Sequence, residues 1–254
     1  MNFLDLTLPT PAENLACDEA LLDWREKSGG GGILRFWESP EVFVVLGYAN
    51  KVAAETNVEA CKANAIPVLR RCSGGGTVLQ GQGVLNYSLI LKIEEGTPTA
   101  SINSANRFIM ERNRAAIEKT LPSHLSPLTS KVLVQGHTDL ALITDHSSLS
   151  TSRKLSGNAQ RRKKDFLLFH GTFLLSFDIS LAEKYLAMPS LQPAYRQHRS
   201  HADFIMNLSV PAETVKRELR SAWNADVPLQ NVPHERIQLL SRDKYMTDRW
   251  NFKF

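Results

Sequence analysis

Two arginines and three glycines stand close together in the first third of the sequence, at Arg70, Arg71, Gly74, Gly75 and Gly76. Glycine has no Cβ and adopts positive φ readily, so a run of glycines lets the backbone approach a ligand closely. Exposed backbone N–H groups beside guanidinium groups suit an anion. The stretch therefore indicates a cradle for a phosphate or a carboxylate, although a glycine-rich hairpin with solvated arginines would show the same residues.

The residues that follow the glycines argue against two common phosphate loops. A dinucleotide-binding fingerprint needs a helix directly after its glycines, whereas residues 77–79 and 84–91 favour strands. A P-loop ends in Gly-Lys-Ser or Gly-Lys-Thr, and this run does not. The pattern that fits is a loop between two strands.

A second polar stretch, residues 153–160, reads Arg-Lys-Leu-Ser-Gly-Asn-Ala-Gln and precedes the apolar strand that contains His170. Together with the Arg-Arg-x-Ser-Gly-Gly-Gly element and with Asn86-Tyr87-Ser88, this order of motifs resembles the lipoate-protein ligase family. That family belongs to a group of biotin and lipoate ligases and lipoyl or octanoyl transferases. The resemblance runs from residue 15 to residue 250, and several motifs in order are more specific than one glycine run.

The resemblance implies a fold and a reaction. The fold is α+β, with a mixed, mainly antiparallel sheet packed with helices, and the irregular order of strands and helices in this sequence agrees with it. Ligases of this family activate lipoate or octanoate with ATP and transfer the acyl group to a lysine of a lipoyl-domain or glycine-cleavage-H-like protein. ATP, Mg2+ and lipoate are thus the expected ligands, and Mg2+ would be held mainly by the phosphates rather than by a metal site of the protein.

The matching motifs imply roles for individual residues. Lys154 is the expected catalytic residue, since the family's lysine contacts the acyl carbonyl and the α-phosphate, where a compact cation stabilises charge. Arg70 and Arg71 would point to opposite faces of a strand, so at most one should reach a phosphate. The other expected site residues are Gly74, Gly75 and Gly76 as backbone donors, Asn86 as a support of the cradle, Asp139 near the nucleotide, Gly157 in the lysine motif, and His170, which could equally be a satisfied core histidine.

Two other activities remain open. One is a transferase that moves octanoyl or lipoyl groups between carrier proteins. Its cysteine-type members have a cysteine before the Asp-Leu element, where this sequence has Gly136-His137-Thr138, so a thiol intermediate is not expected there. The other is one subunit of a split ligase, because larger ligases add a C-terminal accessory domain and a separate accessory-domain protein could supply it. Biotin also remains a candidate acid, and Gln80-Gly81 departs from the histidine and acid of many ligases.

The sequence also predicts the elements that position these residues. Thr10 and Glu13 form a capping box at the start of a helix over residues 11–27, with Leu15 and Leu22 on its buried side. A polar, serine-rich loop over residues 144–152 is expected to close over a ligand. Further helices are expected over residues 57–65, 104–121 and 211–223. Strands are expected over residues 1–8 (an edge strand), 33–37 and 42–46, with a turn between the last two. A loop is expected over residues 122–130, followed by a strand-turn-strand unit over residues 131–143.

The composition is that of a globular enzyme. With 254 residues, 43% of them hydrophobic, the chain can form a proper core, and a single catalytic domain over residues 1–254 is expected. Three cysteines without a C-x-x-C pair predict neither disulfides nor a zinc site. The sequence shows no secretion signal and no membrane-spanning run, which predicts a cytoplasmic protein without a membrane partner. The only dense basic cluster, residues 161–164, lacks interleaved aromatic residues, so a solvated turn is favoured over a nucleic-acid site.

Overall fold

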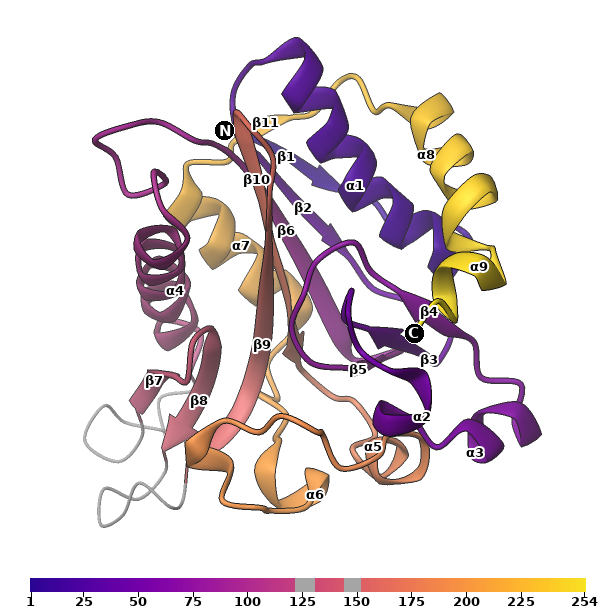
Figure 1. The fold of residues 1–254 in the computed structure, drawn as a ribbon. Coiled ribbons are helices and arrows are strands. Elements are labelled where there is room, and N and C mark those ends of the chain that lie inside the picture. The colour runs from indigo at the N-terminus through magenta and orange to yellow at the C-terminus, as the bar shows by residue number, and fades with distance from the viewer. Residues whose placement is uncertain (122–130, 144–151) are drawn as a thin grey trace.

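The computed structural model describes residues 1–121, 131–143 and 152–254 and contains two β-sheets with helices packed on them (Figure 1). The expected serine-rich loop and the loop over residues 122–130 fall outside the described residues, apart from Ser152. The strands are β1 (Asn2–Asp5), β2 (Ile33–Trp37), β3 (Phe43–Leu46), β4 (Val68–Arg70), β5 (Val78–Gln80), β6 (Val84–Lys92), β7 (Lys131–Gln135), β8 (Asp139–Ile143), β9 (Arg153–Arg162), β10 (Phe166–Leu174) and β11 (Val227–Pro228). The helices are α1 (Pro11–Ser28), α2 (Val52–Glu55), α3 (Val58–Ala63), α4 (Ile102–Glu118), α5 (Ser180–Tyr185), η2 (Ala194–Arg196), α6 (His201–Phe204), α7 (Ala212–Trp223), α8 (His234–Leu240), the π-helical turn η3 (Ser241–Tyr245) and α9 (Asp248–Asn251).

The large sheet has eight strands in the order β11-β1-β2-β6-β10-β9-β8-β7. β1 is parallel to β11 and β2, and every other neighbouring pair is antiparallel. The long β6–β10 pair runs from Val84↔Leu174 to Lys92↔Phe166 and forms the centre of the sheet. This mixed, mainly antiparallel sheet with helices confirms the α+β fold that the sequence predicts, although β1 lies inside the sheet rather than at its edge.

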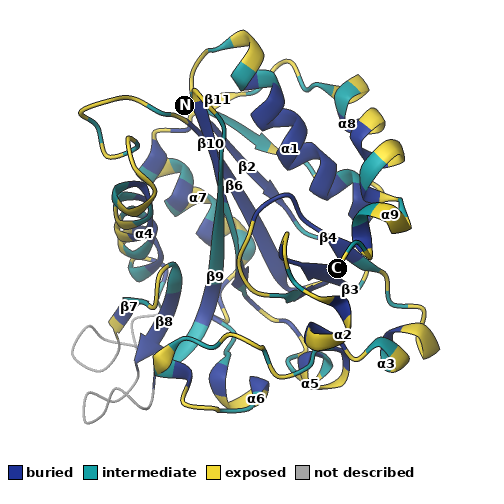
Figure 2. Cartoon of the chain, viewed as in Figure 1, coloured by how far each residue is buried: buried dark blue, intermediate teal, exposed yellow. Residues whose placement is uncertain are grey.

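Helices cover both faces of the large sheet (Figure 1). On one face, α4 packs against β7 and β8 and α7 packs against α4 and β2, and these helices share one continuous apolar cluster with β6 and β10. On the other face lies α1, which packs against β10, α8 and η3 and shares a second cluster with Ile90 and Phe166. Figure 2 shows how completely α1 and the central strands are buried. A sheet buried on both faces explains why β6 reads as a nearly continuous apolar run rather than as an alternating one.

The helix α1 begins where its capping box predicts. The Thr10 hydroxyl accepts a hydrogen bond from the Glu13 N–H at 3.2 Å, and the Glu13 carboxylate accepts one from the Thr10 N–H at 3.0 Å. Pro11 occupies the first turn, where its missing N–H costs nothing. The helix ends at Ser28, before the glycines.

A small sheet in the order β4-β3-β5 stands beside the large one. β3 pairs in parallel with β4 and antiparallel with β5. The turn after β2 thus carries the chain from the large sheet to the small one, and the two strands predicted over residues 33–37 and 42–46 do not form a hairpin. Because β4 and β5 flank residues 71–77, the small sheet fixes both ends of the glycine-rich stretch.

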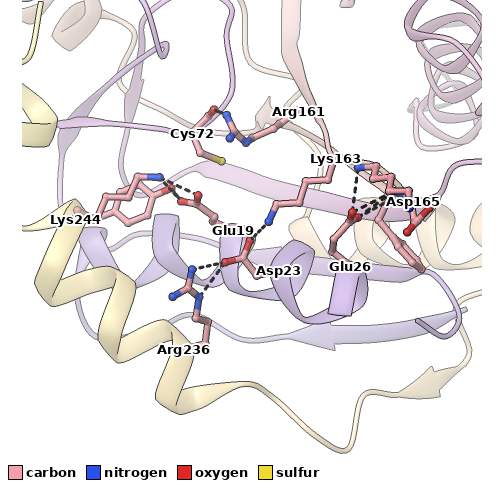
Figure 3. A network of polar contacts seen from close by, with 12 residues as sticks. Glu19, Asp23, Glu26, Cys72, Arg161, Lys163, Asp165, Arg236 and Lys244 are labelled. Atoms are coloured by element: carbon pink, nitrogen blue, oxygen red, sulfur yellow. Dashed lines mark hydrogen bonds and ion pairs between the residues drawn. The ribbon is translucent and has the colours of Figure 1, made fainter. Parts of the chain in front are cut away.

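Carboxylates on α1 bind the basic turn between β9 and β10 and the C-terminal helices (Figure 3). Asp23 accepts hydrogen bonds from Lys163 and Arg236, and the Glu26 carboxylate accepts from the backbone N–H groups of residues 164–166. Glu19 accepts from Lys244 at 2.6 Å and from the Tyr245 hydroxyl at 2.7 Å. The basic cluster is therefore tied into the fold rather than presented as a free cationic surface.

No helix among the described residues is long and apolar enough to span a membrane.

Candidate active site

A cavity of about 780 Å³ opens between the large sheet and the small sheet. Its walls come from β5, β6, β9 and β10, from the glycine-rich stretch, and from the irregular segment around α5 and α6. Cavities of this size, mainly apolar with a few convergent polar groups, are typical of small-molecule sites. The apolar part of the wall includes Leu15, Trp37, Val45, Val78, Leu79, Leu174, Phe177, Ala182 and Leu186.

Lys154 lies in the wall of this cavity, and its ammonium is 2.8 Å from Asp139 Oδ1. The pairing of β8 with β9 brings the two together, with a bulge between Leu140 and Ala141. Gly157 makes room for the lysine, because a Cβ at that position would stand 2.7 Å from the ammonium nitrogen. An ammonium has three donors, so Lys154 can hold Asp139 and still bind a substrate oxygen.

Tyr195 completes this group, since its hydroxyl donates a hydrogen bond to Asp139 Oδ2 at 2.8 Å. Burial, followed by the nearby Asp139 carboxylate, raises the pKa of Tyr195 above its ordinary value, so the hydroxyl stays protonated and remains a donor. Asp139 therefore has one oxygen for each partner. It orients Lys154, and its expected place near the nucleotide stays a prediction.

The glycine loop, defined here as residues 73–77, is held from inside by Arg71. The Arg71 guanidinium donates to the Gly74 carbonyl at 2.6 Å and to the Gly76 carbonyl at 2.7 Å, and burial lowers its pKa to about 10. Gly75 has a φ of +87°, and its carbonyl would lie 2.0 Å from a Cβ on Gly47. Positive φ and close backbone approach thus require glycine at these two positions.

Arg70 lies elsewhere, away from the described residues that line the cavity. Its side chain is fully buried, and its guanidinium donates hydrogen bonds to five backbone carbonyls. Those carbonyls belong to Gly47, Tyr48, Asn50, Trp250 and Asn251. Of the two arginines, only Arg71 is placed to approach a ligand in the cavity, and Arg70 fastens the small sheet to α9.

Asn86 and Gln80 line the cavity and face each other as a closed amide pair. Each side chain donates to the other, at 2.8 and 2.9 Å, so the polar groups of both are satisfied without a ligand. Asn86 thus supports the strand that follows the glycine loop, and Gln80 is its partner at the position where the sequence departs from many ligases.

His170 also lines the cavity, but both ring nitrogens contact protein groups. Nε2 is 2.6 Å from the Ser73 hydroxyl, and Nδ1 is 3.1 Å from Asp18 Oδ2. The imidazole is therefore neither a free cavity base nor a plain core residue, because it connects α1 to the glycine loop.

All three cysteines lie in the described part of the chain, and none of them lines the cavity. Burial raises the pKa of Cys17 to about 11 and that of Cys72 to about 12. A nucleophilic cysteine needs a lowered pKa and an approachable sulfur. The cavity therefore has no thiol of this kind.

A model of the lipoyl protein ligase A/B catalytic domain matches residues 10–222. The chain belongs to this family. Among its relatives, octanoyltransferase LipM of Geobacillus kaustophilus is 28% identical over 99% of this chain and 97% of its own length. Octanoyltransferase LipM of Bacillus subtilis is 27% identical, again over 99% and 97%.

Solved structures of lipoate protein ligases share the fold. A bipartite lipoate protein ligase of Thermoplasma acidophilum, described together with its E2 lipoyl domain, superposes with a TM-score of 0.80 at 21% identity, over 99% of this chain and 95% of that one. A lipoate-protein ligase A bound with ATP gives a TM-score of 0.77 at 21% identity over 99% of both chains. A second Thermoplasma acidophilum structure, a putative lipoate protein ligase with bound lipoic acid, gives 0.74 at 22% identity over the whole of both chains.

The described residues of this family member contain no group of three histidine, cysteine or acidic side chains that could hold a metal ion. Asp139, the acid nearest the lysine, is already held by Lys154 and Tyr195. The side chains of the described residues thus do not fit a protein-bound Mg2+.

Proposed function

We propose that this chain is an ATP-dependent lipoate-protein ligase, which forms an acyl-adenylate from lipoate or octanoate and transfers the acyl group to a lysine of a lipoyl-domain protein. Residues 1–254 would act as one catalytic domain. In the first step a carboxylate oxygen of the acid attacks the α-phosphorus of ATP and pyrophosphate leaves. In the second step the acceptor amine attacks the acyl carbonyl, AMP leaves, and the amine gives up a proton.

The observation that carries this proposal is the Lys154 ammonium, held by Asp139 in the wall of a largely apolar cavity. An apolar wall suits an eight-carbon acyl chain, and a fixed cation stabilises the charge that develops on the α-phosphate and on the acyl carbonyl. Arg71 and the glycine loop add a second electropositive group in the wall of the same cavity. The phosphate of an acyl-adenylate and the oxyanion that forms at its acyl carbonyl would therefore both lie among positive groups.

Two candidate functions differ in the acyl donor that they use. Transfer from an acyl thioester through an enzyme thiol needs a reactive cysteine in the cavity, and none of the three cysteines lies there. An acyl-adenylate needs no enzyme nucleophile, because the acceptor lysine attacks it directly. The residues of the cavity thus favour the adenylate.

Octanoyl transfer between carrier proteins is the second candidate, because the LipM octanoyltransferases cover nearly the full chain. Without an enzyme thiol, the acceptor lysine amine would attack the octanoyl thioester directly, with Lys154 stabilising the oxyanion; the C–S bond would then break, and the carrier thiolate would leave and take up the proton that the amine loses. The bipartite Thermoplasma acidophilum ligase also keeps open the expectation that a separate accessory protein is needed.

The test is to supply each donor separately to the purified chain. With ATP, magnesium and octanoate or lipoate, we expect acyl-adenylate by mass spectrometry and acylation of an added lipoyl domain. Acylation only from an octanoyl-carrier thioester would replace the ligase with the second candidate. Transfer from preformed acyl-adenylate without any adenylation would indicate a missing subunit, and no acylation from any donor would contradict both functions.

A further inference from the structure

The Ser73 hydroxyl fastens the start of the glycine loop at two points. It is 2.6 Å from Nε2 of His170, and its oxygen accepts a hydrogen bond from Nε of Arg71 at 3.1 Å. Ser73 is only 1% exposed, whereas Gly74, Gly75 and Gly76 after it are exposed. The loop therefore has a buried anchor and an open tip.

His170 is in turn held by a buried ion pair. Nδ1 of His170 is 3.1 Å from one oxygen of Asp18, and Arg35 is 2.6 Å from the other. Burial alone would raise the pKa of Asp18. Arg35, and to a lesser extent His170, lower this pKa by more than burial raises it, so the carboxylate is charged. A charged carboxylate only accepts hydrogen bonds, so Nδ1 of His170 donates to Asp18, and Nε2 makes its hydrogen bond with the Ser73 hydroxyl.

Serine, histidine and aspartate in this order also make up the nucleophilic triad of many hydrolases. Three observations argue against a nucleophilic role for Ser73. Its side chain is not part of the cavity wall, Arg71 already donates to its oxygen, and Arg35 neutralises the Asp18 charge that would otherwise help His170 to take a proton. These contacts restrain a loop rather than activate a hydroxyl.

Two backbone N–H groups of the restrained glycine loop point away from Arg71. Arg71 binds the carbonyls of Gly74 and Gly76. In a planar trans peptide the N–H of the next residue points away from the carbonyl. The N–H groups of Gly75 and Thr77 therefore face away from Arg71, and the Cβ position of Gly75 lies 3.5 Å from the Ala159 side chain on β9.

We propose that His170 and Asp18 are positioning residues, which act through the Ser73 hydroxyl to hold the glycine loop with these N–H donors presented to the acyl-adenylate. The identity of that ligand rests on the proposed function. The clamp, meaning Ser73, His170 and Asp18, ties the loop to the sheet through β10 and to α1, where most residues are buried. The glycine-rich loop is thus already ordered before the ligand binds, so ligand binding does not include the entropic cost of ordering the loop.

The experiment measures binding of a non-hydrolysable octanoyl-sulfamoyl adenosine by calorimetry to the full chain and to Ser73→Ala, His170→Asn and the double variant. We expect about 5-fold weaker binding for each single variant, since one hydrogen bond contributes about 1 kcal/mol and a factor of ten corresponds to about 1.4 kcal/mol. The double variant should lose little more than either single variant, because both remove the same restraint. Ser73→Thr, which keeps a hydroxyl, should bind more tightly than Ser73→Ala.

Ser39→Ala is the matched control, because Ser39 is a buried, hydrogen-bonded serine in the turn after β2 and outside the cavity wall. It should bind the analogue normally. If wild-type protein failed to bind the analogue, the proposed function would fail. If wild-type and the clamp variants bound it equally well, or if an octanoyl ester formed on Ser73 after mixing with an octanoyl thioester, the positioning role would be wrong while the family's acyl chemistry remained.

Discussion

Replacing Gly157 with alanine should displace the catalytic lysine without removing it. The new Cβ would stand 2.7 Å from the Lys154 nitrogen and 2.8 Å from its Cε. To reach an ordinary separation of 3.4 Å, the ammonium must move by about 0.7 Å, the difference between 3.4 and 2.7. A misplacement of about 1 Å at a reacting centre can cost about 100-fold in rate. We therefore expect adenylate formation to fall by about 10- to 100-fold.

The fold should tolerate this change. Gly157 lies inside β9 and does not have a positive φ, and alanine is favoured over glycine in such a position by about 0.5 to 1 kcal/mol. Gly31→Ala is a suitable control, because a Cβ there meets no atom within 4 Å. The thermal midpoint should be unchanged or slightly higher in both variants, and only Gly157→Ala should lose activity.

A double-mutant cycle with Lys154→Ala decides whether the displacement is the cause. Lys154→Ala alone should cost about 100- to 1,000-fold in single-turnover adenylation, as loss of one charge-stabilising group does elsewhere. In that background Gly157→Ala should add almost nothing, since there is no ammonium left to move. An undiminished effect of Gly157→Ala in the absence of Lys154, or normal rates in Gly157→Ala itself, would refute the reasoning.

Three further predictions concern residues other than Lys154 and Gly157. Cys72→Ser should keep most of the activity in the acylation assay, because burial holds the pKa of the thiol near 12, and a thioester trapped on Cys72 would contradict this. Arg70→Ala should lower the free energy of unfolding by at least about 3 kcal/mol in urea titrations, since it leaves five buried or part-buried carbonyls without their charged donor, whereas a purely catalytic defect would mean that Arg70 serves the ligand. Burial raises the pKa of Asp18, but Arg35 and His170 together lower it by more, so the pKa in the folded protein is below its ordinary value. The stability that the Asp18 carboxylate contributes is therefore complete above the ordinary pKa of about 4, and it is lost as the pH falls through the lower pKa of the folded protein. Stability measured by denaturation should therefore drop below about pH 4, and Asp18→Asn should flatten that drop; an equally steep curve would be the contrary result.

Much of the fold was predictable because its signals are local. The capping box at Thr10 gives the start of α1, and the apolar runs give the strands of the large sheet. The order of the strands, and the passage from β2 to a separate small sheet, depend on contacts between distant segments that no local pattern specifies. The predicted turn after Trp37 is real, yet it joins two sheets rather than two strands of one.

The candidate site was predictable where a motif contains its residues. Lys154, Gly157 and Asp139 stand in two motifs, and strand pairing brings them together. The choice between Arg70 and Arg71 was not predictable, because the partners of Arg70 lie 20 to 23 positions earlier and 180 to 181 positions later in the chain. Tyr195 was missed, since it belongs to an irregular segment without periodicity.

Asp18 carried a signal that could have been used. It lies three residues after Leu15 and four before Leu22, on the buried side of the predicted helix. A charged residue on such a face is almost never fully buried without a partner. Its position therefore pointed to a buried cation or histidine, which the structure supplies as Arg35 and His170.

The link between Arg70 and α9 bears on how the protein is made. The Arg70 N–H and guanidinium bind Asn251, and the Trp250 indole donates to the Arg70 carbonyl at 2.7 Å. During synthesis, the strand that leads into the glycine loop leaves the ribosome well before these partners. Until residues 250 and 251 emerge, the guanidinium has nothing at that end to bind. The contacts that fasten the small sheet to α9 can therefore form only after residue 251 has left the ribosome.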